Sequence, residues 1–278
     1  MMSPGGGGGA KRALSILVSN DDGIGSEGIY ALVMELKKIA EVTVVAPDRQ
    51  QSAVGHAITM NYPLRVVPYQ RNDEFFGYAV DGTPADAVKF AVRFLMKTTP
   101  DLVVSGINHG SNTAINIIYS GTVSAATEGT ILGIPSMAVS LTTYQKADFG
   151  PAARFARGLA QMVIERGLPP GTLLNVNVPA VPEAEIRGVR VTRQGRSTWE
   201  DTFDVRRDPA GREYFWLTGR LKVTDQDPAT DQIAVQEKFI SVTPIHYNLT
   251  DQEMMARLRE WLPEDRTGKG RGWNPLDF

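Results

Sequence analysis

The 278-residue sequence contains no cysteine and only three histidines. Disulfides, thiolate metal sites and cysteine nucleophiles are therefore excluded, and a reducing compartment such as the cytoplasm is expected. Positive charge is not in excess, because 29 Lys and Arg stand against 31 Asp and Glu, so nucleic acid held by bulk charge is not expected. No apolar run approaches the roughly 20 residues of a membrane-spanning helix, and the first residues lack the apolar stretch of a signal peptide. A membrane partner is not expected either.

The rest of the composition is that of an ordinary globular protein, with 42% apolar and 22% charged residues. Five consecutive glycines, Gly5 to Gly9, predict a disordered tail over residues 1–12, because glycine buries no side chain and loses the most entropy on ordering. A second flexible tail is predicted over 265–278. One α/β domain is predicted between them, over 13–264, with a β-rich extension within about 187–246.

Short apolar runs alternate with segments whose apolar residues recur every three or four positions. The runs predict buried strands at 14–18, 42–47, 102–104, 137–139 and 173–178, and the periodic segments predict helices near 29–39, after 83–84, and at 122–132, 154–166 and 252–262. Such alternation predicts a three-layer, mostly parallel Rossmann-like sheet with helices on both faces. Strands in hairpins are predicted at 189–191, 214–217 and 239–242.

Ligands of such sheets bind beyond the carboxyl ends of the strands, which directs attention to the residues that follow each run. Asp21 and Asp22 follow the first run. Asp-Asp-Gly is also ordinary turn chemistry. At the end of a central strand, however, adjacent like charges need a counter-charge, and a hard divalent cation such as Mg²⁺ supplies it best. Polar residues after the next runs, around Ser52 and Asn108, offer further oxygen donors.

A glycine motif gives a different hypothesis. Gly23, Gly25 and Gly28 have the spacing of a dinucleotide-binding loop, and Asp48 lies 20 residues past Gly28, where a ribose-binding acid is expected. A nicotinamide-dependent oxidoreductase is therefore an alternative function, and a nucleotide-binding module without catalysis is another. The paired aspartates in front of the loop oppose the oxidoreductase, because they would repel a pyrophosphate unless a cation lay between them.

Two later segments are candidate anion sites. Residues 105–112 combine Gly, Ser and Asn, and residues 119–124 place small hydroxyl residues at the start of a predicted helix. Free N–H groups at a helix N-terminus bind phosphate, although Ser120 or Thr122 is equally an ordinary helix cap.

Six segments, in order along the chain, resemble the motifs of the SurE family, the stationary-phase survival proteins that act as metal-dependent 5′/3′-nucleotidases. They are Val18–Ile24, Val45–Ala53, Gly82–Asp86, Val104–Asn112, Ser120–Ala125 and Asn175–Pro179. The resemblance covers about residues 13 to 248. It implies hydrolysis of nucleoside 5′-monophosphates to nucleoside and phosphate by metal-activated water, with 3′-nucleotides and short polyphosphate as further candidate substrates.

The resemblance also assigns residues. It implies one divalent cation, Mg²⁺ or Mn²⁺, per subunit, and the metal ligands fall on Asp21, Asp22, Ser52 and Asn108. Among these, Asp21, Asp22 and Asn108 are the candidate catalytic residues. The phosphate-binding positions fall on Asn112, Ser120, Gly121 and Thr122. Homodimers or homotetramers are implied, with a β-hairpin used for oligomerisation and exchanged between subunits.

Other residues have weaker interpretations. His109 adjoins Asn108 and is a candidate general acid, although a lone histidine is more often structural. Arg193 or Arg196 could attract nucleotide phosphates, but an arginine-rich solvated hairpin or subunit contact is the commoner use. Three nearby aromatic residues could stack a base, although packing is their more usual role: Trp199, Phe203 and Tyr214.

Overall fold

The computed structural model describes residues 12–262, so the two predicted tails lie outside the described residues except for Arg12. The chain divides into two compact units, one ending at Ile245 and one beginning at His246. The second unit contains helix α7 (Gln252–Trp261), whose N-cap Asp251 accepts a hydrogen bond from the Met254 N–H at 2.9 Å. The single domain predicted over 13–264 stays a prediction. Among the described helices, none combines the length and the apolar character needed to cross a membrane.

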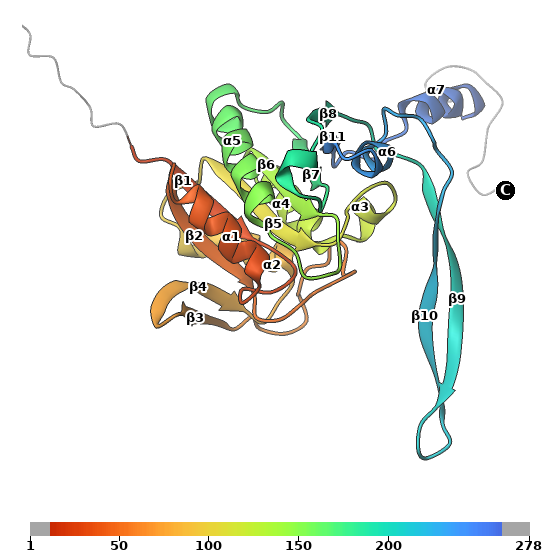
Figure 1. Cartoon of the computed structure of the whole chain (residues 1–278), viewed down its shortest axis with the longest axis horizontal. Helices are drawn as coiled ribbons and strands as arrows, with labels where there is room; N and C mark the ends of the chain where they lie inside the picture. Colours follow the sequence, from red (N-terminus) through yellow and green to blue (C-terminus); the bar gives the residue numbers. More distant parts are fainter. Residues whose placement is uncertain (1–11, 263–278) are drawn as a thin grey trace, which may run out of the picture. The chain divides into compact units, whose positions relative to one another are not determined.

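The first unit is built on one nine-stranded sheet, shown in Figure 1, with the strand order β3-β4-β2-β1-β5-β6-β7-β11-β8. Its strands are β1 (Ser15–Ser19), β2 (Glu41–Pro47), β3 (Val66–Arg71), β4 (Glu74–Val80), β5 (Leu102–His109), β6 (Ser136–Leu141), β7 (Thr172–Val178), β8 (Val189–Val191) and β11 (Ile240–His246). The central pairings β4–β2–β1–β5–β6–β7 are all parallel, whereas β3 and β4 are antiparallel. The predicted mostly parallel α/β sheet is confirmed.

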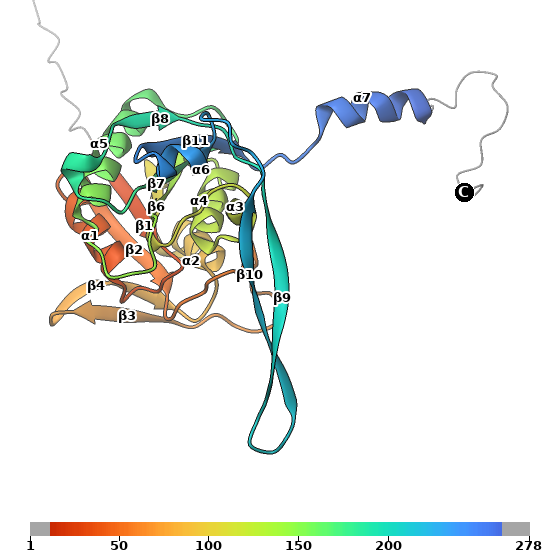
Figure 2. The ribbon, with the colours of Figure 1, turned by 45° about the vertical axis from the view of Figure 1, so that its right-hand side comes forward.

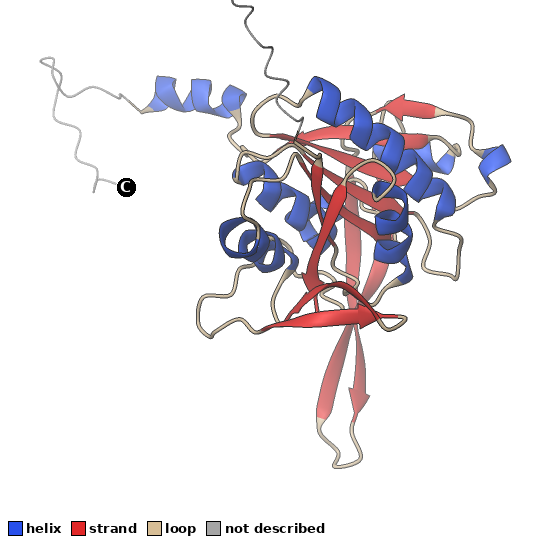
Figure 3. Cartoon of the chain, turned by 90° about the vertical axis from the view of Figure 1, so that its left-hand side faces the viewer, coloured by secondary structure: helices blue, strands red, loops and turns tan. Residues whose placement is uncertain are grey.

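Helices cover both faces of this sheet (Figure 3). On one face lie α1 (Glu27–Leu36) and α5 (Gly150–Arg166), and on the other lie α2 (Pro84–Phe90) and α4 (Gly121–Ile131). The alternation of side chains along β1 explains the three layers, because Ile16 and Val18 pack with α1 whereas Leu17 packs with α2 and α4. Shorter helical segments are α3 (Asn116–Tyr119), α6 (Asp231–Gln236), η1 (Ala91–Leu95) and η2 (Glu183–Glu185).

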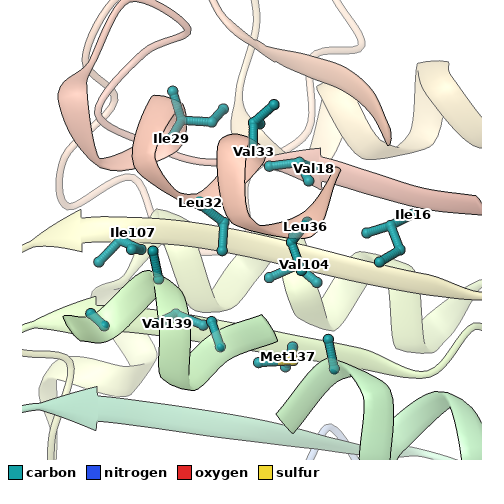
Figure 4. Close-up of a cluster of buried hydrophobic side chains, with 14 of the residues drawn as sticks. Ile16, Val18, Ile29, Leu32, Val33, Leu36, Val104, Ile107, Met137 and Val139 are labelled. Carbon is teal, nitrogen blue, oxygen red and sulfur yellow. The ribbon is translucent and has the colours of Figure 1, made fainter. Parts of the chain in front are cut away.

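The packing of α1 shows why the sequence folds in this way. Ile29, Leu32 and Leu36 lie on one face of the helix and are fully buried against β1 and β5, as Figure 4 shows. Each buried side chain of this size contributes about 1.5–3 kcal/mol relative to exposure. The buried face fixes α1 over the centre of the sheet, and with it the loop between β1 and α1 that carries the two aspartates.

The β-rich extension differs in part from the prediction. Strands β9 (Ser197–Arg207) and β10 (Glu213–Val223) form a long antiparallel hairpin, visible in Figure 2 as a ribbon apart from the main sheet. Strands β8 and β11 were predicted as parts of hairpins, and this was wrong: they pair with each other in parallel at the edge of the main sheet. The reason is that the β9–β10 hairpin and α6 lie between them, and a connection of this length allows parallel pairing.

Candidate functional site

The ends of three neighbouring parallel strands form the candidate site. The three strands are neighbours in the order β2-β1-β5. Asp21 and Asp22 follow β1, Ser52 lies in the loop after β2, and Asn108 is the penultimate residue of β5. A cavity of about 190 Å³ opens at this edge. It is lined by five of the predicted residues: Asp21, Ser52, Asn108, Asn112 and Ser120. The structure therefore brings together residues that are separated by up to 99 positions in sequence.

Asp21 is the most deeply buried carboxylate of the site, with an exposed fraction of 4%. Burial raises its pKa to about 6; the hydroxyl of Thr122, which donates a hydrogen bond to Oδ1, opposes this shift, and the neighbouring Asp22 adds to it. The Asp21 carbonyl accepts a hydrogen bond from the Gln51 N–H at 2.7 Å, which ties the β2 loop to the β1 loop. The protein therefore keeps a carboxylate where its ionised form is disfavoured.

Asp22 lies beside Asp21 and connects the loop after β1 with residues after β2 and at the end of β5. Burial raises its pKa, and the His109 N–H, which donates to Oδ2 at 2.9 Å, lowers it. The Gln50 amide is 3.5 Å from Asp22 Oδ1 and donates to Ser52 Oγ at 2.9 Å. Asp22 does not line the cavity itself, but its two oxygens hold residues from the β2 and β5 loops. Gln50 was missed by the sequence analysis, because only the folded loop brings it to both partners.

The N-terminus of α4 lies directly against Asp21. Ser120 is its N-cap, and Ser120 Oγ accepts a hydrogen bond from the Val123 N–H at 3.1 Å. A Cβ atom on Gly121 would lie 2.7 Å from Asp21 Cβ, so glycine is needed for this approach. Thr122 was predicted to bind phosphate, but its side-chain hydroxyl donates to Asp21, and a backbone hydrogen bond from Thr122 also lowers the pKa of that carboxyl. Because the Val123 N–H donates to Ser120, the Gly121 N–H is the group of the first turn that remains a candidate for an anion.

Two asparagines are held by other amides. The side-chain N–H of Asn108 donates to the Gly110 carbonyl at 2.8 Å, so its side-chain oxygen is the atom left for a ligand. The Asn112 N–H donates to Asn177 Oδ1 at 2.9 Å, and the Asn112 carbonyl accepts from the side chains of Asn175 and Asn177 at 2.8 and 3.0 Å. Asn175 and Asn177 are two positions apart on β7, so both point to one face. The sequence analysis noted their motif without giving them this role.

A buried ion cluster anchors the loop that carries Ser52. Glu128 on α4 is 2% exposed, and its carboxylate contacts both Lys89 and His56, the latter at 3.0 Å. Burial alone would raise the Glu128 pKa, but the hydrogen bonds from His56 and Lys89 outweigh burial and lower it. The Gly55 N–H also donates to the Tyr119 carbonyl at 3.1 Å. The loop after β2 is thus fixed to α4, on which the anion-binding turn lies.

Two of the weaker sequence hypotheses, those on His109 and Arg193, have different outcomes. His109 lines the cavity, and its Nε2 lies 2.7 Å from the Gln145 carbonyl, so this nitrogen acts as a donor to the backbone. A general-acid role for His109 stays a prediction and would have to use the other ring nitrogen. Arg193 contacts Asp225 at 2.7 Å and Asp227 at 2.8 Å, and these aspartates raise its pKa. Its charge is therefore already paired within the chain.

The donor set fits a hard divalent cation. Two carboxylates, a hydroxyl and an amide oxygen are the oxygen ligands that Mg²⁺ and Mn²⁺ prefer. Within residues 12–262, no group of three or more His, Cys, Asp or Glu side chains could hold a metal, so a metal here needs the hydroxyl and amide oxygens as well. The burial of adjacent carboxylates against a helix N-terminus supports the same conclusion, because a cation would neutralise them.

Comparisons with known proteins agree with this geometry. A family model described as survival protein SurE matches residues 16–201. The chain is 52% identical over 246 residues to the 5′-nucleotidase SurE of Chlorobaculum tepidum, covering 88% of this chain and 94% of that protein. It is 53% identical over 248 residues to the 5′-nucleotidase SurE of Syntrophobacter fumaroxidans, covering 89% and 99%. The crystal structure of the SurE protein from Aquifex aeolicus superposes with a TM-score of 0.77 at 40% identity, covering 89% of this chain and 99% of that one.

Proposed function

The chain belongs to the SurE family, and from this membership we propose that it is a 5′-nucleotidase that hydrolyses nucleoside 5′-monophosphates with one divalent cation, Mg²⁺ or Mn²⁺, per subunit. The observation that carries the proposal is the burial of Asp21 beside Asp22 and against the N-terminus of α4. Two carboxylates would repel a phosphate monoester at this place, whereas a cation between them attracts it. Because recognition is centred on the phosphoryl group, 3′-nucleotides and short polyphosphate are included as further substrates.

Each side chain then has a proposed role. Asp21, Asp22, Ser52 and Asn108 would hold the cation, which when bound neutralises charge on the phosphoryl group and acidifies water. The backbone N–H of Gly121, with Ser120 and Asn112, would bind the phosphoryl oxygens. Asp22 accepts the proton of the attacking water. The water oxygen bonds to phosphorus as the ester P–O bond breaks, and the leaving alkoxide takes up a proton from solvent to become the nucleoside hydroxyl.

Metal removal tests the proposal. We expect the purified chain to release phosphate from AMP, EDTA to abolish this release, and Mg²⁺ or Mn²⁺ in excess to restore it, measured by a colorimetric phosphate assay. A binding module would bind AMP in a calorimeter without releasing phosphate, and an oxidoreductase would bind NADH with a change in its fluorescence. Full activity in the presence of EDTA would contradict the metal dependence.

A cytoplasmic location stays a prediction from the cysteine-free composition.

We also propose that the chain forms homodimers or homotetramers through the β9–β10 hairpin. An isolated two-stranded hairpin is only marginally stable, and this one exposes Phe203, Val205, Phe215, Trp216 and Leu217, each by 54–64%. Sedimentation velocity is expected to give a dimer or tetramer for the unaltered chain and a monomer for a Phe203→Glu, Leu217→Glu variant. A monomeric unaltered chain at micromolar concentration would refute the proposal.

A further inference from the structure

A second cavity adjoins the candidate site. Its volume is about 550 Å³, within the range of small-molecule sites, and it shares four lining residues with the 190 Å³ cavity: Ser111, Asn116, Tyr144 and Trp199. The two cavities are therefore neighbours across a common wall of side chains. Resting on the proposed function, we propose that the larger cavity is the nucleoside subsite, in which the base stacks on Trp199 and Tyr144 while the phosphate occupies the smaller cavity.

Both aromatic rings lie at the junction of the two cavities, and a hydrogen bond fixes one of them. The Trp199 indole N–H donates to Asn116 Oδ1 at 2.9 Å, which fixes the ring at the root of β9. The Tyr144 ring lies on Gly110, where a Cβ atom would come within 2.5 Å of Tyr144 Cε1. Both rings nevertheless remain accessible, with exposed fractions of 42% and 81%. Two accessible rings beside the proposed anion site form a stacking platform, and such a platform accepts any base because every base has a π-face.

The lining of the larger cavity is mostly uncharged. Gln232 and Gln236 on α6 contribute uncharged polar side chains to it. Among the described lining residues Lys238 is the only charged one, so the cavity suits an uncharged group that carries hydrogen-bond donors and acceptors, as a nucleobase and a ribose do.

Separate probes of the two cavities test the proposal. Trp199→Ala is expected to raise the KM for AMP roughly tenfold, the size of one lost base–aromatic stack, with kcat changed less than about twofold. The inhibition constant of adenosine should rise by a similar factor, whereas that of inorganic phosphate and the KM for glycerol 2-phosphate should not change. Trp199→Phe, which keeps an aromatic face, should retain most of the affinity for AMP.

The matched control is Trp261→Ala, which removes an exposed tryptophan in α7 and should change none of these constants. Gln232→Leu should weaken adenosine but not phosphate. The subsite proposal is overturned if Trp199→Ala weakens AMP, glycerol 2-phosphate and phosphate equally, since the ring would then support the site as a whole. If the unaltered chain hydrolyses neither ester, the proposed function fails, and calorimetric binding of adenosine to both variants decides the subsite independently.

Discussion

Asp21→Asn and Asp22→Asn are each expected to lower kcat/KM for AMP by at least roughly a thousandfold. Each removes a negative charge from the proposed cation site, and the charge stabilisation that a metal supplies to phosphoryl transfer amounts to several kcal/mol, at 1.36 kcal/mol per factor of ten. Asparagine keeps one acceptor oxygen, which can serve the Thr122 hydroxyl at position 21 and the His109 N–H at position 22, so the fold should be preserved. Calorimetry should also show that Mn²⁺ binds more than tenfold more weakly.

Asp21→Asn should also make the metal-free protein more stable. Asp21 is a buried carboxylate with another carboxylate beside it, so neutral asparagine removes an unfavourable charge. The melting temperature measured in EDTA should rise by about 2–4 °C per kcal/mol gained. Asp73→Asn, in the exposed turn between β3 and β4, is the control and should change neither the melting temperature nor the Mn²⁺ affinity. An Asp21→Asn variant with normal turnover and normal Mn²⁺ affinity would remove the basis of the metal site.

Gly28→Ala is expected to lower the free energy of unfolding by about 3 kcal/mol. A Cβ atom at this position in α1 would lie 2.0 Å from the backbone carbonyl oxygen of Ile107, which cannot rotate away. Alanine favours a helix by about 1 kcal/mol over glycine, and this gain is too small to offset the clash. Urea unfolding should show a lower midpoint with an unchanged m-value. Because Ile107 precedes Asn108, Mn²⁺ affinity should fall as well.

Gly25→Ala, in the same glycine motif, is the matched control for this prediction. The nearest atom to a Cβ there is the Tyr69 hydroxyl at 3.0 Å, the end of a flexible side chain, so we expect less than about 1 kcal/mol of destabilisation and normal AMP hydrolysis. In a dinucleotide-binding loop the second glycine allows close approach to the pyrophosphate. Equal destabilisation by the two substitutions would mean that close packing of α1 on β5 does not explain Gly28.

The sequence predicted the central strands of the fold well, for a physical reason. Buried parallel strands are continuous apolar runs, so β1, β2, β5, β6 and β7 were evident, and parallel strands must end at the same edge. The β3–β4 hairpin was missed, although β4 is itself a mostly apolar run. The signal was Asn72-Asp73, a two-residue turn in which both residues adopt positive φ, 53° and 61°.

The contacts that hold the site could not be predicted in the same way. Glu128 meets His56 and Lys89 across 72 and 39 residues, and no local pattern encodes such a pairing. The Thr122 hydroxyl was expected to bind phosphate, but in the folded chain it donates a hydrogen bond to the buried carboxylate of Asp21. A resemblance at the level of motifs identifies which residue types gather at an edge. The folded chain decides which of them bind a ligand and which hold their neighbours.

The two cavities draw on different stretches of polypeptide. The residues proposed for hydrolysis lie between positions 21 and 122, whereas most of the wall of the larger cavity comes from positions 142 to 238. On the proposed assignment, mutations in the later stretch are expected to alter nucleoside affinity more than bond cleavage. Exchange of this stretch between relatives would then change how tightly a nucleoside is held while the residues proposed for hydrolysis stay the same.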